Sequence, residues 1–219
     1  MKAVVFDAYG TLFDVHSAMQ RYAARLGPAW QDISQTWRAK HVEYSLVRTL
    51  TGHHRSFDRL MREALEFSAS KHGIDDPALL NELELAYRAL DAFADVVPTL
   101  MRLRGMGLRT AILSNGEPDM LDDGVRHAGL DGLLDAVLAI SPLGAFKPLP
   151  RVYTLATEHF GLAPGDVAFL SSNAWDAFGA HSFGMRVFWV NRSQQPDEYD
   201  LAATVPVLSG LDALPTMLT

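Results

Sequence analysis

The 219-residue chain contains no cysteine, which excludes disulfide bridges, thiolate metal sites and cysteine nucleophiles. No run of about 18 apolar residues is present either, so a membrane span is not expected. The apolar run at the N-terminus is interrupted by Asp7 before it could serve as a signal peptide. These absences predict a cytoplasmic protein whose chemistry depends on carboxylates, hydroxyls, histidine, lysine or arginine.

Positive charge is also scarce, because 19 lysines and arginines face 26 aspartates and glutamates. The formal net charge of −7 argues against nucleic acid or an anionic membrane as a partner. The 8 histidines show no metal-ligand spacing, and the neighbouring His53 and His54 cannot both point from one face of a helix. We therefore expect no metal site.

What the chain does contain is an alternation of short apolar runs with helix-length segments. The runs with a strand pattern are residues 2–6, 108–114, 135–140, 166–171 and 186–190. Near-continuous apolar strands that alternate with helices are typical of a parallel sheet covered by helices on both faces. The prediction is an α/β fold with a Rossmann-like, doubly wound parallel sheet.

The segment after the first strand interrupts this alternation with four amphipathic helix patterns and no convincing strand. The four patterns lie at residues 17–27, 32–50, 56–73 and 76–90. This predicts a core domain made of residues 1–14 plus 93–219. Residues 15–92 are predicted to form an inserted helical-bundle cap subdomain.

Polar side chains come directly after several of the expected strands. They are Asp7 after the first strand, Ser114 and Asn115 at the end of the second, Lys147 after the third, and Ser171, Asn173 and Asp176 at and beyond the end of the fourth. In open α/β sheets ligands bind beyond the carboxyl ends of the strands. We therefore expect these residues to meet in one site beneath the cap.

Five stretches carry a resemblance to a known family. They are FDAYGTLFD (6–14), WRAKHVEYS (37–45), LSNG (113–116), FKPLPRVY (146–153) and LSSNAWDAFGA (170–180). In this order and spacing they resemble the haloacid dehalogenase-like (HAD) superfamily and, within it, the L-2-haloacid dehalogenases. The resemblance implies the HAD fold and the hydrolysis of short-chain (S)-2-haloalkanoic acids to (R)-2-hydroxy acids and halide, with fluoroacetate as a more demanding sub-case.

Position 9 distinguishes this pattern from the phosphatases of the same superfamily. In those enzymes an acid two residues beyond the nucleophilic aspartate protonates the leaving alcohol and later activates water. The present sequence has Tyr9 there, and an ordinary tyrosine pKa of about 10 makes it a poor base. Because a halide leaves without a proton, Tyr9 fits dehalogenation.

The resemblance implies that Asp7 attacks the halogen-bearing carbon and forms an ester, which water then hydrolyses, with inversion at the carbon. No metal and no organic cofactor are implied. Lys147 is implied to hold the Asp7 carboxylate, and Thr11 to orient it. Ser171, Asn173 and Asp176 are implied to position the water and Lys147, with Asp176 as the base. Tyr153 is implied to join their network.

A second set is implied to bind the 2-haloacid substrate and the halide. Ser114 binds the substrate carboxylate together with backbone N–H groups near the first strand, where Ala8 lies. Arg38 meets the departing halide or the substrate carboxylate from the cap, and Asn115 joins it in holding the halide. The apolar wall around the substrate comes from Tyr9, Val42, Phe57 and Trp175. The family also suggests a homodimer, formed through the cap helices.

Several of these roles have structural alternatives. An arginine on an amphipathic helix is ordinarily a solvated charge, which is the alternative for Arg38, and Lys147 could be a surface lysine. Thr11 could serve a turn or a helix cap, and Tyr153 could be a core aromatic. The wall residues could equally belong to the hydrophobic core.

The sequence departs from the family pattern at three positions. Leu149 replaces an acid that is usual in family members, Ala39 replaces a larger polar residue, and Val42 is small for a wall residue. The two cap positions leave substrate size and halogen preference open. The competing interpretations are a magnesium-dependent phosphatase of the same superfamily and a non-enzymatic relative that binds a small acid or a protein.

Overall fold

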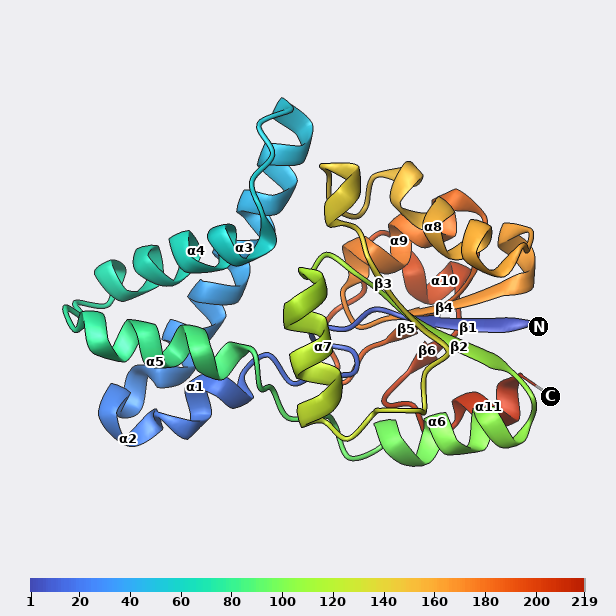
Figure 1. Cartoon of the computed structure of the whole chain (residues 1–219), viewed down its shortest axis with the longest axis horizontal. Helices are drawn as coiled ribbons and strands as arrows, with labels where there is room; N and C mark the ends of the chain where they lie inside the picture. The colour runs from blue at the N-terminus through green and yellow to red at the C-terminus, as the bar shows by residue number, and fades with distance from the viewer. Residues whose placement is uncertain (219) are drawn as a thin grey trace.

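The computed structural model describes residues 1–218 and is built on a six-stranded parallel sheet with the strand order β3-β2-β1-β4-β5-β6 (Figure 1). The strands are β1 (Ala3–Phe6), β2 (Arg109–Ser114), β3 (Ala136–Ala139), β4 (Val167–Ser171), β5 (Arg186–Val190) and β6 (Val207–Leu208). The five strands expected from the sequence are confirmed, with ends that differ by at most one residue. The sixth was not expected, because two residues are too few to show a pattern.

Helices cover both faces of the sheet, as the apolar strands require. In the view of Figure 1, α8 (Pro150–Phe160) and α9 (Ala174–Phe183) lie above the sheet, and α6 (Val96–Gly105) and α11 (Leu214–Met217) lie below it. The remaining core helices are α7 (Pro118–His127), α10 (Leu201–Thr204) and the 3₁₀ turns η2 (Ser141–Leu143) and η3 (Pro164–Asp166). All four residues of the central strand β1 are fully buried.

A second group of helices lies beside the carboxyl ends of the strands, at the left of Figure 1. Its members are α1 (Ser17–Arg21), α2 (Ala23–Leu26), the 3₁₀ turn η1 (Gly27–Ala29), α3 (Trp30–Thr51), α4 (Phe57–Lys71) and α5 (Pro77–Tyr87). The single helix expected at residues 17–27 is wrong, because the chain leaves helical geometry at Tyr22, with φ −106° and ψ 12°. The other three helix patterns each correspond to one helix.

This helical group is held together by buried apolar side chains and by hydrogen bonds between its helices. The Trp37 indole N–H donates to the Met61 carbonyl at 2.9 Å, and the Ser68 hydroxyl donates to the Ile33 carbonyl at 2.7 Å. Both bonds join α3 to α4. None of the helices in residues 1–218 is long and apolar enough to cross a membrane.

The chain enters and leaves the helical group at neighbouring points. The Asp14 N–H donates to the Asp91 carbonyl at 2.8 Å, and the Phe93 N–H donates to the Leu12 carbonyl at 3.1 Å. The two crossing segments are therefore tied to each other near Asp7. Residues 15–92 as the exact extent of a cap stay a prediction.

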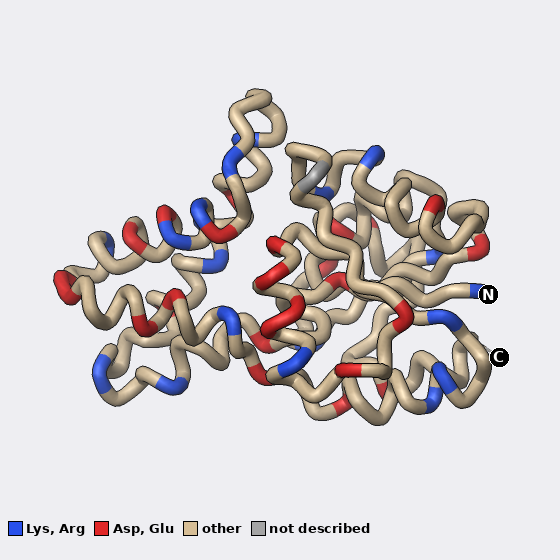
Figure 2. The backbone as a smooth tube through the Cα atoms, viewed as in Figure 1, with Lys and Arg blue, Asp and Glu red and all other residues tan. Residues whose placement is uncertain are grey.

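The helical group and the core also meet through charged side chains. Acidic residues gather along α7 beside the helical group (Figure 2), and Arg88 forms ion pairs with Asp119 at 2.5 Å and with Asp123 at 2.8 Å. The Glu117 carboxylate accepts the Phe57 N–H at 2.8 Å, at the first turn of α4. A carboxylate is favourable at a helix N-terminus, so Glu117 fixes α4 above the strand ends.

Candidate active site

Asp7 lies one residue beyond β1 and is held by the turn that follows β1 and by groups from two other strand ends, those of β3 and β4. Its N–H donates to the Leu170 carbonyl at 2.8 Å, which extends the β1–β4 pairing by one residue. Its Oδ2 accepts hydrogen bonds from Thr11 Oγ1 at 3.0 Å, Asn173 Nδ2 at 2.8 Å and Ser171 Oγ at 3.4 Å. Among the residues that the structure describes, its Oδ1 has one partner, the ammonium of Lys147 at 3.0 Å.

Lys147 lies between two buried carboxylates. Its Nζ is 3.0 Å from Asp7 Oδ1 and 2.9 Å from Asp176 Oδ2, and its side chain is 1% exposed. Burial acts to lower the pKa of Lys147, but Asp176 and Asp7 outweigh it and raise that pKa above its ordinary value. The lysine therefore stays charged, and the surface-lysine alternative is wrong.

Asp176 completes this network behind the lysine. Its Oδ1 accepts the Tyr153 hydroxyl at 2.7 Å, and Oδ2 accepts Lys147. Burial raises the pKa of Asp176 to about 6, although Lys147 acts in the opposite direction. The close packing of α8 on α9 depends on Gly179, because a Cβ there would lie 2.5 Å from Pro148 Cβ and 2.6 Å from the Tyr153 hydroxyl oxygen.

Tyr9 forms part of an aromatic stack beside Asp7. Its ring centroid is 5.0 Å from that of Phe57 and 5.5 Å from that of Tyr87. Burial, reinforced by Tyr87, raises the pKa of Tyr9 well above its ordinary value, so its hydroxyl stays protonated. The Tyr9 ring can pack here because residue 116 is glycine, since a Cβ at Gly116 would lie 2.9 Å from Tyr9 Cε2.

Arg38 reaches from α3 across to the core. Its Nη2 donates to the Tyr9 carbonyl at 3.1 Å and to Asn173 Oδ1 at 3.2 Å. Asn173 in turn donates to Asp7, so the cap arginine is two hydrogen bonds from the carboxylate. The solvated-charge alternative for Arg38 is therefore wrong.

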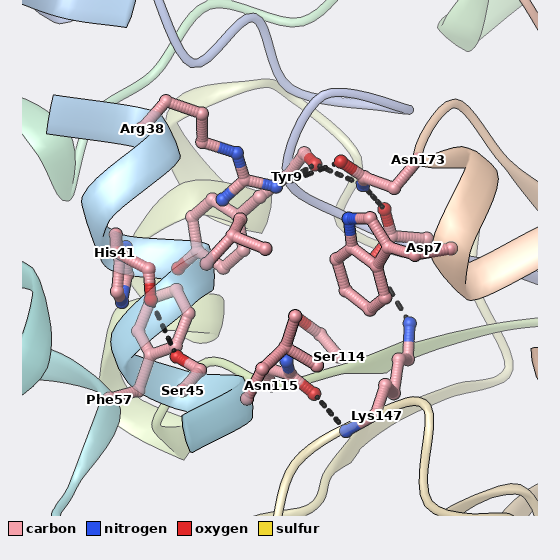
Figure 3. Close-up of a pocket in the computed structure, with 13 residues that line it drawn as sticks. Asp7, Tyr9, Arg38, His41, Ser45, Phe57, Ser114, Asn115, Lys147 and Asn173 are labelled. Carbon is pink, nitrogen blue, oxygen red and sulfur yellow. Dashed lines mark hydrogen bonds and ion pairs between the residues drawn. The ribbon is translucent and has the colours of Figure 1, made fainter. Parts of the chain in front are cut away.

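Ser114, the last residue of β2, and Asn115, which follows it, line the same pocket on the side opposite Arg38 (Figure 3). The fully buried Ser114 hydroxyl accepts the Gly116 N–H at 3.2 Å, which leaves its own hydrogen free to donate. The Asn115 side-chain oxygen accepts the backbone N–H of Lys147 at 3.0 Å. The Asn115 side-chain NH₂ is therefore left to donate to another acceptor.

These groups enclose a pocket of about 380 Å³, its open mouth included (Figure 3). It is lined by Asp7, Tyr9, Arg38, His41, Val42, Ser45, Leu46, Phe57, Ser114, Asn115, Lys147, Asn173 and Trp175. All of the wall residues expected from the sequence, Tyr9, Val42, Phe57 and Trp175, line it.

The sequence interpretation missed His41, Ser45 and Leu46. Together with Arg38 and Val42 they follow the helical spacing i, i+3, i+4, i+7 and i+8 along α3, so the position of Arg38 was itself the signal that could have found them. Burial and the neighbouring Arg38 lower the pKa of His41 to about 3, so its ring is neutral at pH 7. Within residues 1–218, its buried Nε2 has no hydrogen-bond partner.

Five of the expected site residues do not line the pocket. They are Ala8, Thr11, Tyr153, Ser171 and Asp176, all of which are buried beneath the residues that do. Thr11 contacts Asp7 from behind and also accepts the Ser172 N–H at 2.8 Å. The Ala8 carbonyl accepts from the N–H groups of the following turn, including that of Thr11 at 3.2 Å.

The residues present do not form a usual metal site. No group of three or more His, Cys, Asp or Glu side chains in the described part of the chain could hold an ion. The space between the Asp7 and Asp176 carboxylates contains the Lys147 ammonium instead. The arrangement is suited to nucleophilic attack by a carboxylate that the Lys147 ammonium holds in position.

Comparison with known proteins places this geometry in a family. A family model for haloacid dehalogenase-like hydrolases matches residues 1–184. (S)-2-haloacid dehalogenase 1 from Pseudomonas sp. (strain CBS-3) is 41% identical over 219 residues, which cover 100% of this chain and 96% of that protein.

Solved structures agree with this assignment. A crystal structure of a dehalogenase has a TM-score of 0.96 and 39% sequence identity, with 99% of this chain and 96% of that chain covered. The L-2-haloacid dehalogenase from Xanthobacter autotrophicus with chloropropionic acid covalently bound has a TM-score of 0.88 and 36% identity, with 100% and 98% covered. The sequence-based recognition is confirmed: the chain belongs to the haloacid dehalogenase-like hydrolases, in the family of the (S)-2-haloacid dehalogenases.

Proposed function

We propose that the protein hydrolyses short-chain (S)-2-haloalkanoic acids to (R)-2-hydroxy acids and halide, through an aspartyl ester on Asp7 and with inversion. The observation that supports this most is the unequal bonding of the two Asp7 oxygens. Three neutral donors surround Oδ2, whereas within residues 1–218 Oδ1 has only the Lys147 ammonium and keeps lone-pair capacity for attack.

In the first step Asp7 Oδ1 attacks the substrate Cα from the side opposite the halogen, and the C–halogen bond breaks with its electron pair on the halide. The free hydrogen of Ser114 donates to the substrate carboxylate. Arg38 and the Asn115 amide offer N–H donors to the departing halide. No proton is transferred in this step, which agrees with a tyrosine at position 9 that stays protonated.

In the second step water adds to Asp7 Cγ, and the former Oδ2 becomes the oxyanion. Thr11, Asn173 and Ser171 already point their donors at that oxygen, so the site is organised for the tetrahedral intermediate. Collapse then breaks the Cγ–Oδ1 bond and releases Oδ1 with the hydroxy acid. Lys147, which is 3.0 Å from Oδ1, donates to the leaving oxygen.

Asp176 is proposed as the group that accepts the proton lost by water. Because it is fully buried with both oxygens bonded, the proton reaches it through Lys147 rather than by direct contact with the pocket. With a pKa of about 6, Asp176 is mostly ionised at neutral pH, and this pKa is near enough to the working pH for Asp176 to accept a proton. Asp176 also holds Lys147 in place during the first step.

The proposal is tested by incubation with L-2-chloropropionate and with fluoro-, chloro- and bromoacetate, while halide and D-lactate are measured. Halide release that persists in EDTA supports the dehalogenase and argues against a magnesium-dependent phosphatase. A single turnover in oxygen-18 water should label Asp7 before the product. No halide above a denatured control from any of the four acids, or label that enters the product first, would refute the mechanism.

Two further assignments belong to this proposal. Residues 15–92 are proposed to act as a cap that supplies Arg38 and the apolar wall. A homodimer through the cap is supported by Val47 and Leu50 on α3, which are 51% and 83% exposed. Light scattering tests the dimer, and Leu50→Lys should shift the protein toward monomer.

A further inference from the structure

A second cleft lies on the other side of Arg38 from the reaction pocket. It runs between helices α1 and α3 and the loop that follows β5, and its volume is about 1420 Å³ with its open side included. Gln31, Gln35 and Arg38 line it from one face of α3, at the helical spacing i, i+4 and i+7. The substrate pocket described above does not explain this cleft.

The reaction pocket and the cleft share two lining residues, Arg38 and Asn173. The Arg38 Nη2 donates to Asn173 Oδ1 at 3.2 Å and to the Tyr9 carbonyl at 3.1 Å, and these bonds form the partition between the two spaces. Tyr9 lies on the pocket side and the neighbouring Gly10 on the cleft side. A guanidinium can exchange such hydrogen bonds for bonds to an anion without moving its backbone.

The cleft is polar, and two of its residues have a buried atom without a hydrogen-bond partner among residues 1–218. These atoms are Ser172 Oγ and Arg192 Nε. The terminal nitrogens of Arg192 are used by Asp95, at 2.7 and 2.9 Å. A buried N–H or O–H that lacks a partner is costly, and a bound anion or water relieves that cost.

Arg38 is the cation that an anion in the cleft would meet. Within residues 1–218 no carboxylate forms an ion pair with Arg38, whereas Arg192 is paired with Asp95 at 2.7 Å. Asp14 also lines the cleft, and its Oδ1 accepts the backbone N–H of His16 at 2.9 Å. The His16 ring is half-buried and is bonded to the Ser34 hydroxyl at 2.7 Å. The other lining groups near Arg38 are neutral amides, which can donate N–H groups to a halide.

Each turnover of the proposed reaction leaves a halide beside Arg38 in a pocket that the organic product still fills. We propose that the cleft is a second halide site, through which the expelled ion leaves the protein by passing around the Arg38 side chain. The ion exchanges one donor set, on the pocket side, for another that includes Ser172 and Arg192. This inference rests on the proposed function, because it takes the halide to be a product.

The site is tested first without turnover, with bromide as the probe. Crystals of the wild-type protein soaked in sodium bromide should show an anomalous peak in the cleft, within hydrogen-bond distance of Arg38. Gln35→Trp, which fills the cleft from an exposed position on α3, should lose that peak and keep any bromide in the reaction pocket. A wild-type cleft with no bromide would overturn the proposal.

The route is tested by a first-turnover measurement that compares ester formation with the appearance of halide in solution. Mass spectrometry of quenched samples follows the Asp7 ester, and a halide-sensitive dye follows the free ion. In Gln35→Trp the ester should form at the wild-type rate. Halide should appear in solution more slowly, by a factor of up to about ten, as expected for a blocked exit. Ala39→Trp, on an exposed part of the same helix outside both spaces, is the matched control.

The outcomes separate the two proposals. If halide keeps pace with the ester in Gln35→Trp, the cleft is not the exit, even where bromide binds there at crystal concentration only. If wild-type protein forms no ester and releases no halide, the proposed function fails, and the bromide experiment still decides whether the cleft binds the ion.

Discussion

The side of the pocket formed by the core domain differs in construction from the side formed by the cap helices. On the core side, residues from three separate strand ends, those of β1, β3 and β4, meet at Asp7, and the charged groups there have partners at hydrogen-bond distance. On the cap side, one face of α3 supplies a stripe of side chains, and two buried polar atoms, His41 Nε2 and the Tyr87 hydroxyl, have no partner in residues 1–218.

This difference separates the chemistry of the site from its selectivity. The core network is satisfied before any substrate arrives, so it can hold Asp7 ready without reorganisation. The cap wall is largely apolar and lies on a helix that can vary one side chain at a time. Core substitutions should therefore change the reaction rate, and cap substitutions should change which acid is accepted.

The largest effect is expected for Asp7→Asn, which removes the nucleophile from the core side. Turnover should fall by about 10⁴-fold or more, as for the loss of other covalent nucleophiles. Chloride release from L-2-chloropropionate measures it, with mass spectrometry to confirm that the asparagine has not deamidated. Substantial remaining turnover would show that this carboxylate does not attack.

Lys147→Met should be the next most damaging change. It leaves the Asp7 and Asp176 carboxylates buried without their shared cation, so one of them takes up a proton. We expect kcat to fall by about 10²–10³-fold and the free energy of unfolding to fall by about 3–5 kcal/mol. Kinetics and urea denaturation measure the two effects, and Lys40→Met on the exposed side of α3 is the control.

Tyr153→Phe should produce a smaller change that depends on pH. The Tyr153 hydroxyl lowers the pKa of Asp176, which burial raises to about 6, so its removal should raise that pKa further. Asp176 must be ionised to hold Lys147, and therefore the acid limb of the kcat/KM profile should move to higher pH. At neutral pH the loss should be about tenfold or less.

A role for Tyr153 in packing alone would lower activity equally at all pH values and leave the acid limb in place. Tyr199→Phe serves as the comparison, because that tyrosine is 49% exposed and lies outside the pocket. A limb that moves in both variants, or in neither, would contradict the proposed link between the hydroxyl and Asp176.

The smallest effect is expected on the cap side. Val42→Ala widens the wall, so the ratio of kcat/KM for 2-chlorobutyrate to that for chloroacetate should rise by about fourfold, the equivalent of ~0.8 kcal/mol per buried CH₂. Val47→Ala, at a position of α3 that is 51% exposed, should leave the ratio unchanged. A drop in rate with both acids and no change in ratio would remove the distinction between the two sides.

The sequence predicted the core side better than the cap side, for a physical reason. Parallel strands end at one edge of a sheet, so the positions of Asp7, Ser114 and Lys147 along the chain already implied that they would meet. Their hydrogen-bond partners follow from that geometry. The cap side depends on how α3 is rotated over the core, and in the sequence only the resemblance at Arg38 indicated that rotation. His41 was missed because the helical spacing was not extended from Arg38 to the next turn.

Two other features required the folded structure. The break at Tyr22 divides an expected helix in two, because the packing of α1 against α3 and α5 overrides a continuous amphipathic pattern. Asp176 was expected at the site, but its position behind Lys147 could not be inferred, since it depends on how far α9 reaches past the end of β4.

Gly179 shows how the activity could be lost without any change to a reacting group. It lies one turn after Asp176 on α9, where a single methyl group would meet both Pro148 and the Tyr153 hydroxyl. A substitution there would push apart the two helices that carry the ends of the charge network. Among related sequences, the residue at this position is therefore a simple indicator of whether a chain with all the catalytic side chains can still assemble them.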